Sequence, residues 1–253
     1  MKIIVMNNQK FLEFPHICKT RLELFHKLKK EYSKKINGFY SLNSEIVFVE
    51  FDEVDNNWNF SEIKDKDILM ELSFLKLYKK AVAFAPEKHG QQKYGGFLPY
   101  AYHLKQTDKV IDAFAEEIPL GNFFKLKTAC WLHDVLEDTP INFEQLSREF
   151  TPEIADIVLR VTKINEDNTI EFEKSYYENM AKNPLAVYVK IADKSANAKQ
   201  TIKDKSVWHA QRLVKGHVLF QKCTYGQIKA DKMKNYLDNL IKKLEKISYE
   251  KNA

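Results

Sequence analysis

The chain has 253 residues, a formal net charge of +5, 44% hydrophobic residues and 30% charged residues, a composition typical of ordinary globular proteins. It has no apolar stretch long enough to span a membrane and no signal-peptide core at its N-terminus. Its three scattered cysteines lack CxxC spacing and argue against a disulfide framework or a structural zinc site. These features predict a soluble cytoplasmic protein. The basic residues are interspersed with acids, so nucleic acid is not an expected partner.

Residues 1–62 combine short β-type runs with one basic helical segment. Residues 2–6 and 45–51 are rich in β-branched and aromatic residues and predict strands. Residues 19–36 carry leucines among many lysines, as a surface helix does, and an Asn-Gly turn follows them. We therefore predict a small α+β extension of unknown role, in which nothing points to chemistry. Its two histidines are interpreted as surface residues: His16 and His26.

Residues 63–253 form a mainly helical body in this interpretation. Apolar residues recur at three- and four-residue steps from Ile68 until Pro86 and Gly90 end the first helix. A loop over 87–98 follows, and Pro99 is predicted to be the first residue of the helix that carries His103. A third helix is predicted near 122–138, and Asn142 with Gln145 resembles a capping box at the start of a fourth. A fifth helix is predicted to start at Thr151-Pro152, a sixth to cover 170–182, and a seventh to start at Asn183-Pro184. Two more helices are predicted at the C-terminus.

Four metal- and proton-handling side chains gather at the end of the helix predicted over 122–138. On a helix, His133 and Glu137 share one face, and Asp134 and Asp138 share the next. Three grouped carboxylates repel one another unless a cation or solvent offsets their charge. The apolar residues just before them border a core, which favours a metal site. A solvated acidic helix end is the alternative, because Thr-Pro stops the helix directly afterwards.

Two further candidates lie far away in the sequence. Divalent ions bind imidazoles and carboxylates that converge from different elements. His103 lies near a helix start, and Asp193 directly follows an apolar helical run, where a buried charge needs a partner. An ordinary surface or salt-bridged side chain is the alternative for each, and for His103 alone it is the preferred one. Spacing alone leaves both readings open.

Five segments in order add a resemblance to this pattern. They are residues 88–91 (Lys-His-Gly-Gln), 99–103 (Pro-Tyr-Ala-Tyr-His), 133–139 (His-Asp-Val-Leu-Glu-Asp-Thr), 161–163 (Val-Thr-Lys) and 189–193 (Val-Lys-Ile-Ala-Asp) with Asn197. Together they resemble the HD-domain hydrolases of the RelA/SpoT type, which degrade the alarmone (p)ppGpp. The resemblance extends from about residue 70 to residue 202.

The resemblance implies an HD-domain helical bundle and a role for each matched residue. A divalent metal, usually manganese in that family, would be held by His103, His133, Asp134 and Asp193. Glu137 and Asp138 would position and deprotonate the attacking water, and Asn197 would contact the nucleotide. The implied reaction is hydrolysis at the ribose 3′ position with release of pyrophosphate. Such an ion lowers the pKa of its water and offsets charge at phosphorus, and a nearby carboxylate can take the proton.

The sequence departs from the family in the loop before His103, where family members usually carry an adjacent basic pair. Here that loop has Lys93 and Tyr94, which we predict to contact the phosphate and the base of the nucleotide, respectively. No synthetase domain or regulatory tail is recognised, which predicts a small single-activity hydrolase. The altered loop leaves two alternatives: an HD phosphohydrolase of another nucleotide such as NADPH, and a non-catalytic nucleotide-binding regulator. The intact pair Glu137 and Asp138 speaks against the regulator.

Overall fold

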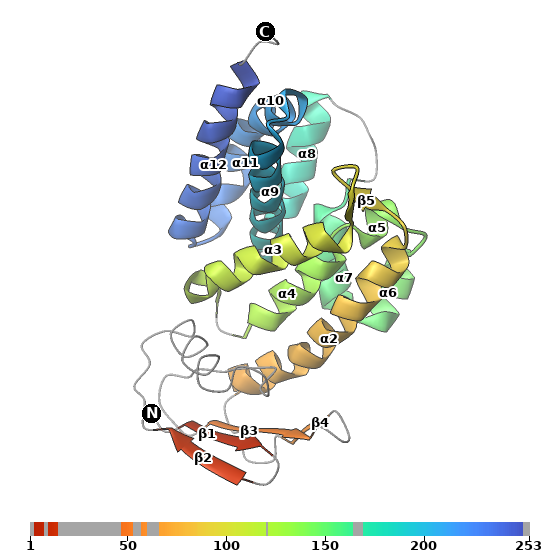
Figure 1. Cartoon of the computed structure of the whole chain (residues 1–253), viewed down its shortest axis with the longest axis vertical. Coiled ribbons are helices and arrows are strands. Elements are labelled where there is room, and N and C mark those ends of the chain that lie inside the picture. Colours follow the sequence, from red (N-terminus) through yellow and green to blue (C-terminus); the bar gives the residue numbers. More distant parts are fainter. Residues whose placement is uncertain are drawn as a thin grey trace.

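The computed structural model describes residues 3–7, 10–14, 47–52, 57–59, 66–119, 121–163 and 169–249, with side chains from Phe74 onward (Figure 1). Near the N-terminus, β1 (Ile3–Asn7), β2 (Lys10–Phe14), β3 (Val47–Asp52) and β4 (Asn57–Asn59) form one sheet in the order β2-β1-β3-β4. β1 pairs parallel with β3, and the outer pairs are antiparallel. Both predicted strands are confirmed. The predicted helix over 19–36, its turn and the two histidines lie outside the described residues, and the boundary near residue 62 stays a prediction.

The body is helical, as predicted, and is built around one long helix. This helix is α9 (Pro184–Asp204), and most of its residues are buried. The other elements of the body are α2 (Lys66–His89), β5 (Lys93–Tyr94), β6 (Leu98–Pro99), α3 (Ala101–Ala113), η1 (Ala115–Glu117), α4 (Phe123–Leu132), α5 (Val135–Asp138), α6 (Phe143–Glu149), α7 (Pro152–Val161), α8 (Ile170–Ala181), α10 (Val207–Lys215), α11 (His217–Thr224), η2 (Tyr225–Gln227) and α12 (Asp231–Tyr249). α9 packs against α3, α4, α7, α8, α10 and α12. Figure 1 shows α3 crossing close to the lower end of α9.

Side-chain caps fix several helix starts where the sequence predicts them. Asn142 accepts from the Gln145 N–H at 2.9 Å and its own N–H donates to the Gln145 side chain at 3.0 Å, which confirms the capping box of α6. Thr151 caps α7 just before Pro152. Asn183 does the same for α9, which begins at a proline whose missing N–H costs nothing there.

Some predicted boundaries are wrong. Pro86 lies inside α2, which continues to His89, and Gly90 follows the helix with φ at +53°. Pro99 belongs to β6 and α3 begins at Ala101, because the predicted loop is a small hairpin: Tyr94 pairs with Leu98, and the Tyr100 N–H donates to the carbonyl of Gln92. The C-terminal part holds three described α-helices rather than two: α10, α11 and α12.

The helix predicted over 122–138 is also interrupted. α4 ends at Leu132, His133 and Asp134 form a turn, and α5 resumes at Val135. A buried ion network holds α4 against α3: the Lys127 ammonium lies 2.9 Å from Asp108 and 2.6 Å from Asp112. Such a network is costly to break because it would leave a buried charge unpaired. It therefore fixes the two helices that carry His103 and lead into His133.

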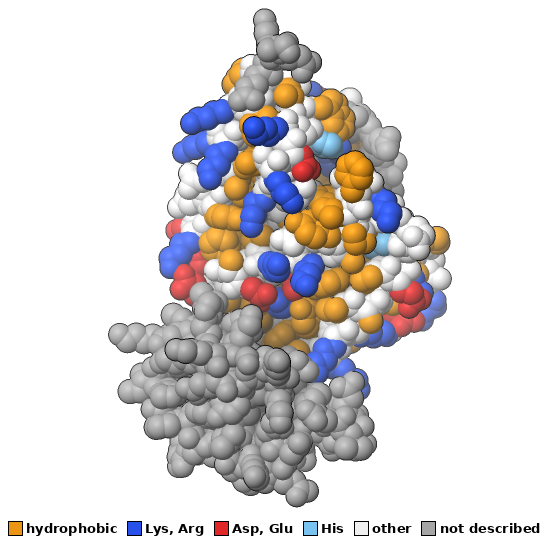
Figure 2. Space-filling view, viewed as in Figure 1, with side chains coloured by type: hydrophobic (Ala, Val, Ile, Leu, Met, Phe, Trp, Pro, Cys, Tyr) orange, Lys and Arg blue, Asp and Glu red, His pale blue; other side chains and the backbone are white. Residues whose placement is uncertain are grey.

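The described helices include none that is both long and apolar enough to cross a bilayer. On the face in Figure 2, lysine and arginine side chains occur in several separate groups, with apolar and acidic side chains between them. Of the three cysteines, Cys130 and Cys223 are free thiols, and Cys18 lies outside the described residues.

Candidate active site

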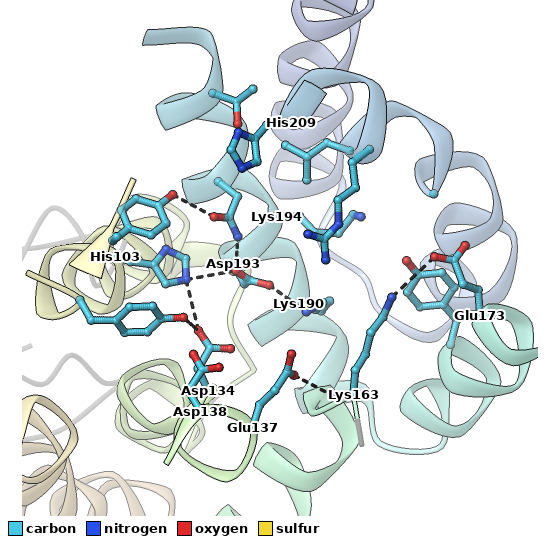
Figure 3. A pocket seen from close by; sticks show the side chains of 18 residues that line it. His103, Asp134, Glu137, Asp138, Lys163, Glu173, Lys190, Asp193, Lys194 and His209 are labelled. Carbon is cyan, nitrogen blue, oxygen red and sulfur yellow. Dashed lines mark hydrogen bonds and ion pairs between the residues drawn. The ribbon is translucent and has the colours of Figure 1, made fainter. Parts of the chain in front are cut away.

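Four predicted side chains converge from three helical segments. His103 comes from the first turn of α3, His133 and Asp134 come from the break between α4 and α5, and Asp193 comes from the middle of α9. Figure 3 shows His103, Asp134 and Asp193 pointing toward one another. The two Nε2 atoms of the histidines are 3.1 Å apart. Asp134 Oδ2 lies 2.9 Å from His133 Nε2 and 3.5 Å from His103 Nε2. Asp193 Oδ1 lies 3.3 Å and 3.6 Å from the Nε2 atoms of His103 and His133.

These atoms fit a divalent cation. Ligand atoms of His103, His133 and Asp134 lie within 4.8 Å of one another, and Asp193 joins them on the side of the histidines. Ligands about 2.1 Å from an ion lie about 3 Å from their neighbours in an octahedral arrangement, close to the separations seen here. The other ring nitrogen of His133, Nδ1, is 2.8 Å from the carbonyl of Cys130. A proton on Nδ1 therefore leaves Nε2 free to bind a cation.

The charges of the cluster lead to the same interpretation. Burial alone would lower the pKa of His133, but the carboxylates of Asp134 and Asp193 raise it to about 10. Burial opposes the charge on Asp134, yet His133 and His103 hold its pKa well below the usual range. Positive charge is thus strongly favoured at the point between these side chains. A metal ion would supply that charge in place of the shared protons.

Glu137 and Asp138 line one wall of the same pocket, and part of each side chain is open to solvent. The Lys163 N–H donates to Glu137 Oε2 at 2.9 Å, and the Gln92 amide donates to Asp138 Oδ2 at 2.9 Å. The surrounding walls remove water from Glu137 and raise its pKa, although the Lys163 N–H and the Lys190 charge offset part of this effect. A carboxylate of raised pKa near a metal site is suited to accept a proton.

The pocket has a volume of about 350 Å³, and basic side chains line the part of it away from His103. Lys190 is paired with Asp193 at 2.9 Å, and Lys163 lies 3.6 Å from Glu173. Lys194 is only 7% exposed and has no ion-pair partner among the described residues. Burial and the neighbouring Lys190 lower the pKa of Lys194 to about 8. A buried amine beside other cations and without its own carboxylate favours an anionic ligand.

Of the three residues predicted to contact substrate, two lie in the pocket and one does not. Tyr94 and Asn197 line the pocket with His103, Asp134 and Asp193, whereas Lys93 is exposed and is not among the lining residues. Sequence reasoning missed the basic side chains. Two of them, Lys163 and Lys190, lie inside segments that carried the resemblance and could have been singled out there. The other three basic side chains were also missed: Lys194, which directly follows Asp193, and His209 and Arg212, which lie beyond the last matched residue.

Comparisons with known proteins agree with this geometry. No protein-family model matches the chain. It is 34% identical over 152 residues to a guanosine-3′,5′-bis(diphosphate) 3′-pyrophosphohydrolase of Spiroplasma citri, which covers 54% of this chain and 20% of that protein. A protein of the same name from Aquifex aeolicus is 32% identical over 48% of this chain and 17% of its own length. The resemblance to hydrolases of the RelA/SpoT type is confirmed. The chain matches about a fifth of the length of these curated relatives.

Other relatives carry a different name. A GTP pyrophosphokinase rsh of Brucella ovis is 29% identical over 48% of this chain and 16% of its own length. Among solved structures, a metazoan SpoT ortholog described as hydrolysing ppGpp aligns with a TM-score of 0.46 and 22% identity, over 68% of this chain and 93% of that one.

Proposed function

We propose that the chain is a metal-dependent pyrophosphohydrolase that removes the 3′-pyrophosphate of guanosine-3′,5′-bis(diphosphate) or a closely related nucleotide. The observation that carries the proposal is the convergence of two imidazole nitrogens and two carboxylates beside Glu137, at a pocket that also holds four lysine and arginine side chains. The names of the relatives from Spiroplasma citri and Aquifex aeolicus supply the nucleotide and the bond.

In this proposal, His103, His133, Asp134 and Asp193 hold a divalent ion, with manganese as our first choice. When bound, such an ion lowers the pKa of water and offsets negative charge at phosphorus. Two imidazoles and two carboxylates suit manganese, which accepts both nitrogen and oxygen ligands. Four protein ligands would leave positions on a six-coordinate ion for other oxygens.

Glu137 would act as the proton acceptor. Water adds to the phosphorus bonded to the ribose 3′ oxygen, and Glu137 takes its proton while the bond from phosphorus to the 3′ oxygen breaks. The 3′ oxygen takes a proton from solvent and becomes the hydroxyl of the nucleoside 5′-diphosphate, and pyrophosphate leaves. The Lys163 N–H on Oε2 fixes the Glu137 carboxylate, so that its other oxygen remains for the water. Asp138, held by Gln92, would help to position that water.

The basic side chains would bind the phosphates that are not cleaved. Lys163, Lys194 and Arg212 line the pocket together, and the buried Lys194 gains most from an anionic partner. A substrate with phosphate groups at two positions of its sugar would satisfy both the ion and this cationic wall. Tyr94 and Asn197 line the pocket beside His103 and would meet the nucleoside. Lys93 lies on the exposed side of the hairpin and would contribute less to phosphate binding than the basic side chains in the pocket.

Hydrolysis is favoured over pyrophosphate transfer, the activity named for the Brucella ovis relative. A carboxylate of raised pKa beside a cluster of imidazoles and carboxylates suits proton removal from water. The test is to incubate the purified chain and manganese with guanosine-3′,5′-bis(diphosphate), its adenosine counterpart and NADPH, and to separate the products by chromatography. We expect guanosine 5′-diphosphate and pyrophosphate, and none after chelation. No product from any nucleotide, or undiminished product with chelator, would contradict the proposal.

A further inference from the structure

We propose that the hydroxyls of two tyrosines in the hairpin segment, Tyr94 and Tyr100, position the two carboxylates of the site, an inference that rests on the proposed metal-dependent function. Tyr100 acts directly: its hydroxyl donates to Asp134 Oδ2 at 2.6 Å. Tyr94 acts through Asn197: its hydroxyl donates to Asn197 Oδ1 at 2.8 Å, and the Asn197 amide donates to Asp193 Oδ1 at 2.6 Å.

The bonded oxygens are the ones that face the histidines. Asp134 Oδ2 accepts the Tyr100 bond and lies 2.9 Å from His133 Nε2. Asp193 Oδ1 accepts the Asn197 bond and lies 3.3 Å from His103 Nε2. A carboxylate oxygen has more than one lone pair, so it can accept a hydrogen bond and still face a cation. Partners of this kind orient ligands before the ion arrives.

The hairpin holds both tyrosine rings in place. The Tyr94 ring stacks on the His103 imidazole, with centroids 4.7 Å apart and planes at 21°, and the Tyr100 ring meets the same imidazole edge-on at 5.7 Å. Gly95, with φ at +59°, turns the chain directly after Tyr94. A side chain at Gly95 would begin 3.8 Å from the Asp204 carboxylate at the end of α9, so the hairpin lies against that helix. The packing of the two rings therefore fixes the direction of the Tyr94 and Tyr100 hydroxyls.

Both tyrosine hydroxyls act as donors, because each meets an oxygen atom at hydrogen-bond distance and a phenol is protonated at neutral pH. Asn197 has its oxygen engaged by Tyr94 and one amide hydrogen engaged by Asp193, which leaves its second amide hydrogen for a ligand. Tyr94 thus fixes the orientation of Asn197, which in turn orients Asp193 and directs its remaining N–H toward a ligand.

The experiment is a calorimetric titration of manganese into chelator-treated protein, with the melting temperature of the ion-free protein measured alongside. The variants are Tyr94→Phe, Tyr100→Phe, Asn197→Ala and the double variant Tyr94→Phe/Asn197→Ala. Phenylalanine keeps the packed ring and removes only the hydroxyl. The matched control is Tyr102→Phe, because the Tyr102 ring lies 6.4 Å from that of Tyr94 and its hydroxyl donates no hydrogen bond to a described residue.

We expect Tyr100→Phe and Tyr94→Phe to weaken manganese binding about tenfold or more, as losses of outer partners do, with melting temperatures close to wild type. Tyr102→Phe should bind as wild type does. The double variant should bind no more weakly than Asn197→Ala alone, because Tyr94 acts through Asn197. Wild-type affinity in both tyrosine variants would overturn the inference, and fully additive losses in the double variant would overturn the route through Asn197.

Failure of this inference is distinct from failure of the proposed function. A wild-type chain that binds manganese and hydrolyses the nucleotide, with tyrosine variants of equal affinity, overturns the positioning role alone. A wild-type chain that binds manganese but releases no product, with weakened tyrosine variants, overturns the proposed reaction and supports the positioning role. A wild-type chain that binds no manganese overturns both.

Discussion

Glu137 and Lys163 are joined by a hydrogen bond that ties α5 to the end of α7: the backbone N–H of Lys163 donates to Glu137 Oε2 at 2.9 Å (Figure 3). The bond uses the backbone of Lys163, so its side chain is not held by Glu137 and lies at the pocket wall, 3.6 Å from Glu173. One oxygen of Glu137 is therefore held and the other faces the pocket, which is the arrangement expected of a positioned proton acceptor.

We predict that Glu137→Gln removes most turnover while manganese affinity and melting temperature stay near wild type. Glutamine keeps the shape and can still accept the Lys163 N–H through its carbonyl oxygen, but it cannot take a proton. A positioned acid–base group contributes about 10²–10⁴-fold in rate. Single-turnover rates with guanosine-3′,5′-bis(diphosphate) would measure the loss. Asp138→Asn is the matched control, and if it alone abolishes turnover, the proton acceptor is Asp138.

The raised pKa of Glu137 predicts how turnover depends on pH. The pocket walls raise this pKa above that of an ordinary glutamate. Only the ionised carboxylate can accept a proton, so kcat should be full above this pKa and should fall as the pH drops through it. The acid limb should therefore lie above the range of an exposed carboxyl. Rates at saturating substrate across the acid range would measure it, and an acid limb that persists unchanged in Glu137→Gln would assign it to another group.

Much of the fold and site could be predicted because the signals are local. Capping residues such as Asn142 and Asn183 mark helix starts within a few positions, and the motif residues at 133–138 lie together in the chain. The break between α4 and α5 is different. The helical pattern continues through His133 and Asp134, whereas in the structure they form a turn that faces His103 and Asp193 from other helices.

The cationic wall could not be predicted for a related reason. Arg212 lies on α10, outside every recognised motif, and reaches the pocket only because α10 packs against α9. Lys194 follows Asp193 in an apolar run, where sequence alone cannot tell whether a lysine is buried or extends to solvent. Conversely, Lys93 suggested phosphate binding by its position in the loop, but the hairpin leaves it exposed.

We predict that the basic side chains of the pocket, rather than Lys93 in the hairpin, bind the substrate phosphates. Lys163→Ala and Arg212→Ala should raise KM for guanosine-3′,5′-bis(diphosphate) about tenfold, the scale of one lost charged hydrogen bond, and should affect a nucleotide without 5′-phosphates less. Lys93→Ala removes the same charge on the exposed side of the hairpin, and we expect a smaller change in KM. A large effect of Lys93→Ala with none from Lys163→Ala would mean that the hairpin, rather than the wall, binds phosphate.

Addition of manganese is expected to stabilise the chain against heat, because the proposed ligands come from α3, α9 and the turn between α4 and α5, which separate on unfolding. An ion that binds only the folded state contributes about 2.7 kcal/mol at a concentration of 100 times its Kd. For a protein of this size, that corresponds to a rise in melting temperature of roughly 5–10 °C. Calorimetric melts with manganese, and then with excess chelator, would measure a rise that chelation reverses. His103→Gln should lose most of it, because the imidazole Nε2 lies within 3.5 Å of both carboxylates. A His103→Gln protein that gains as much stability as wild type would show that the ion binds elsewhere.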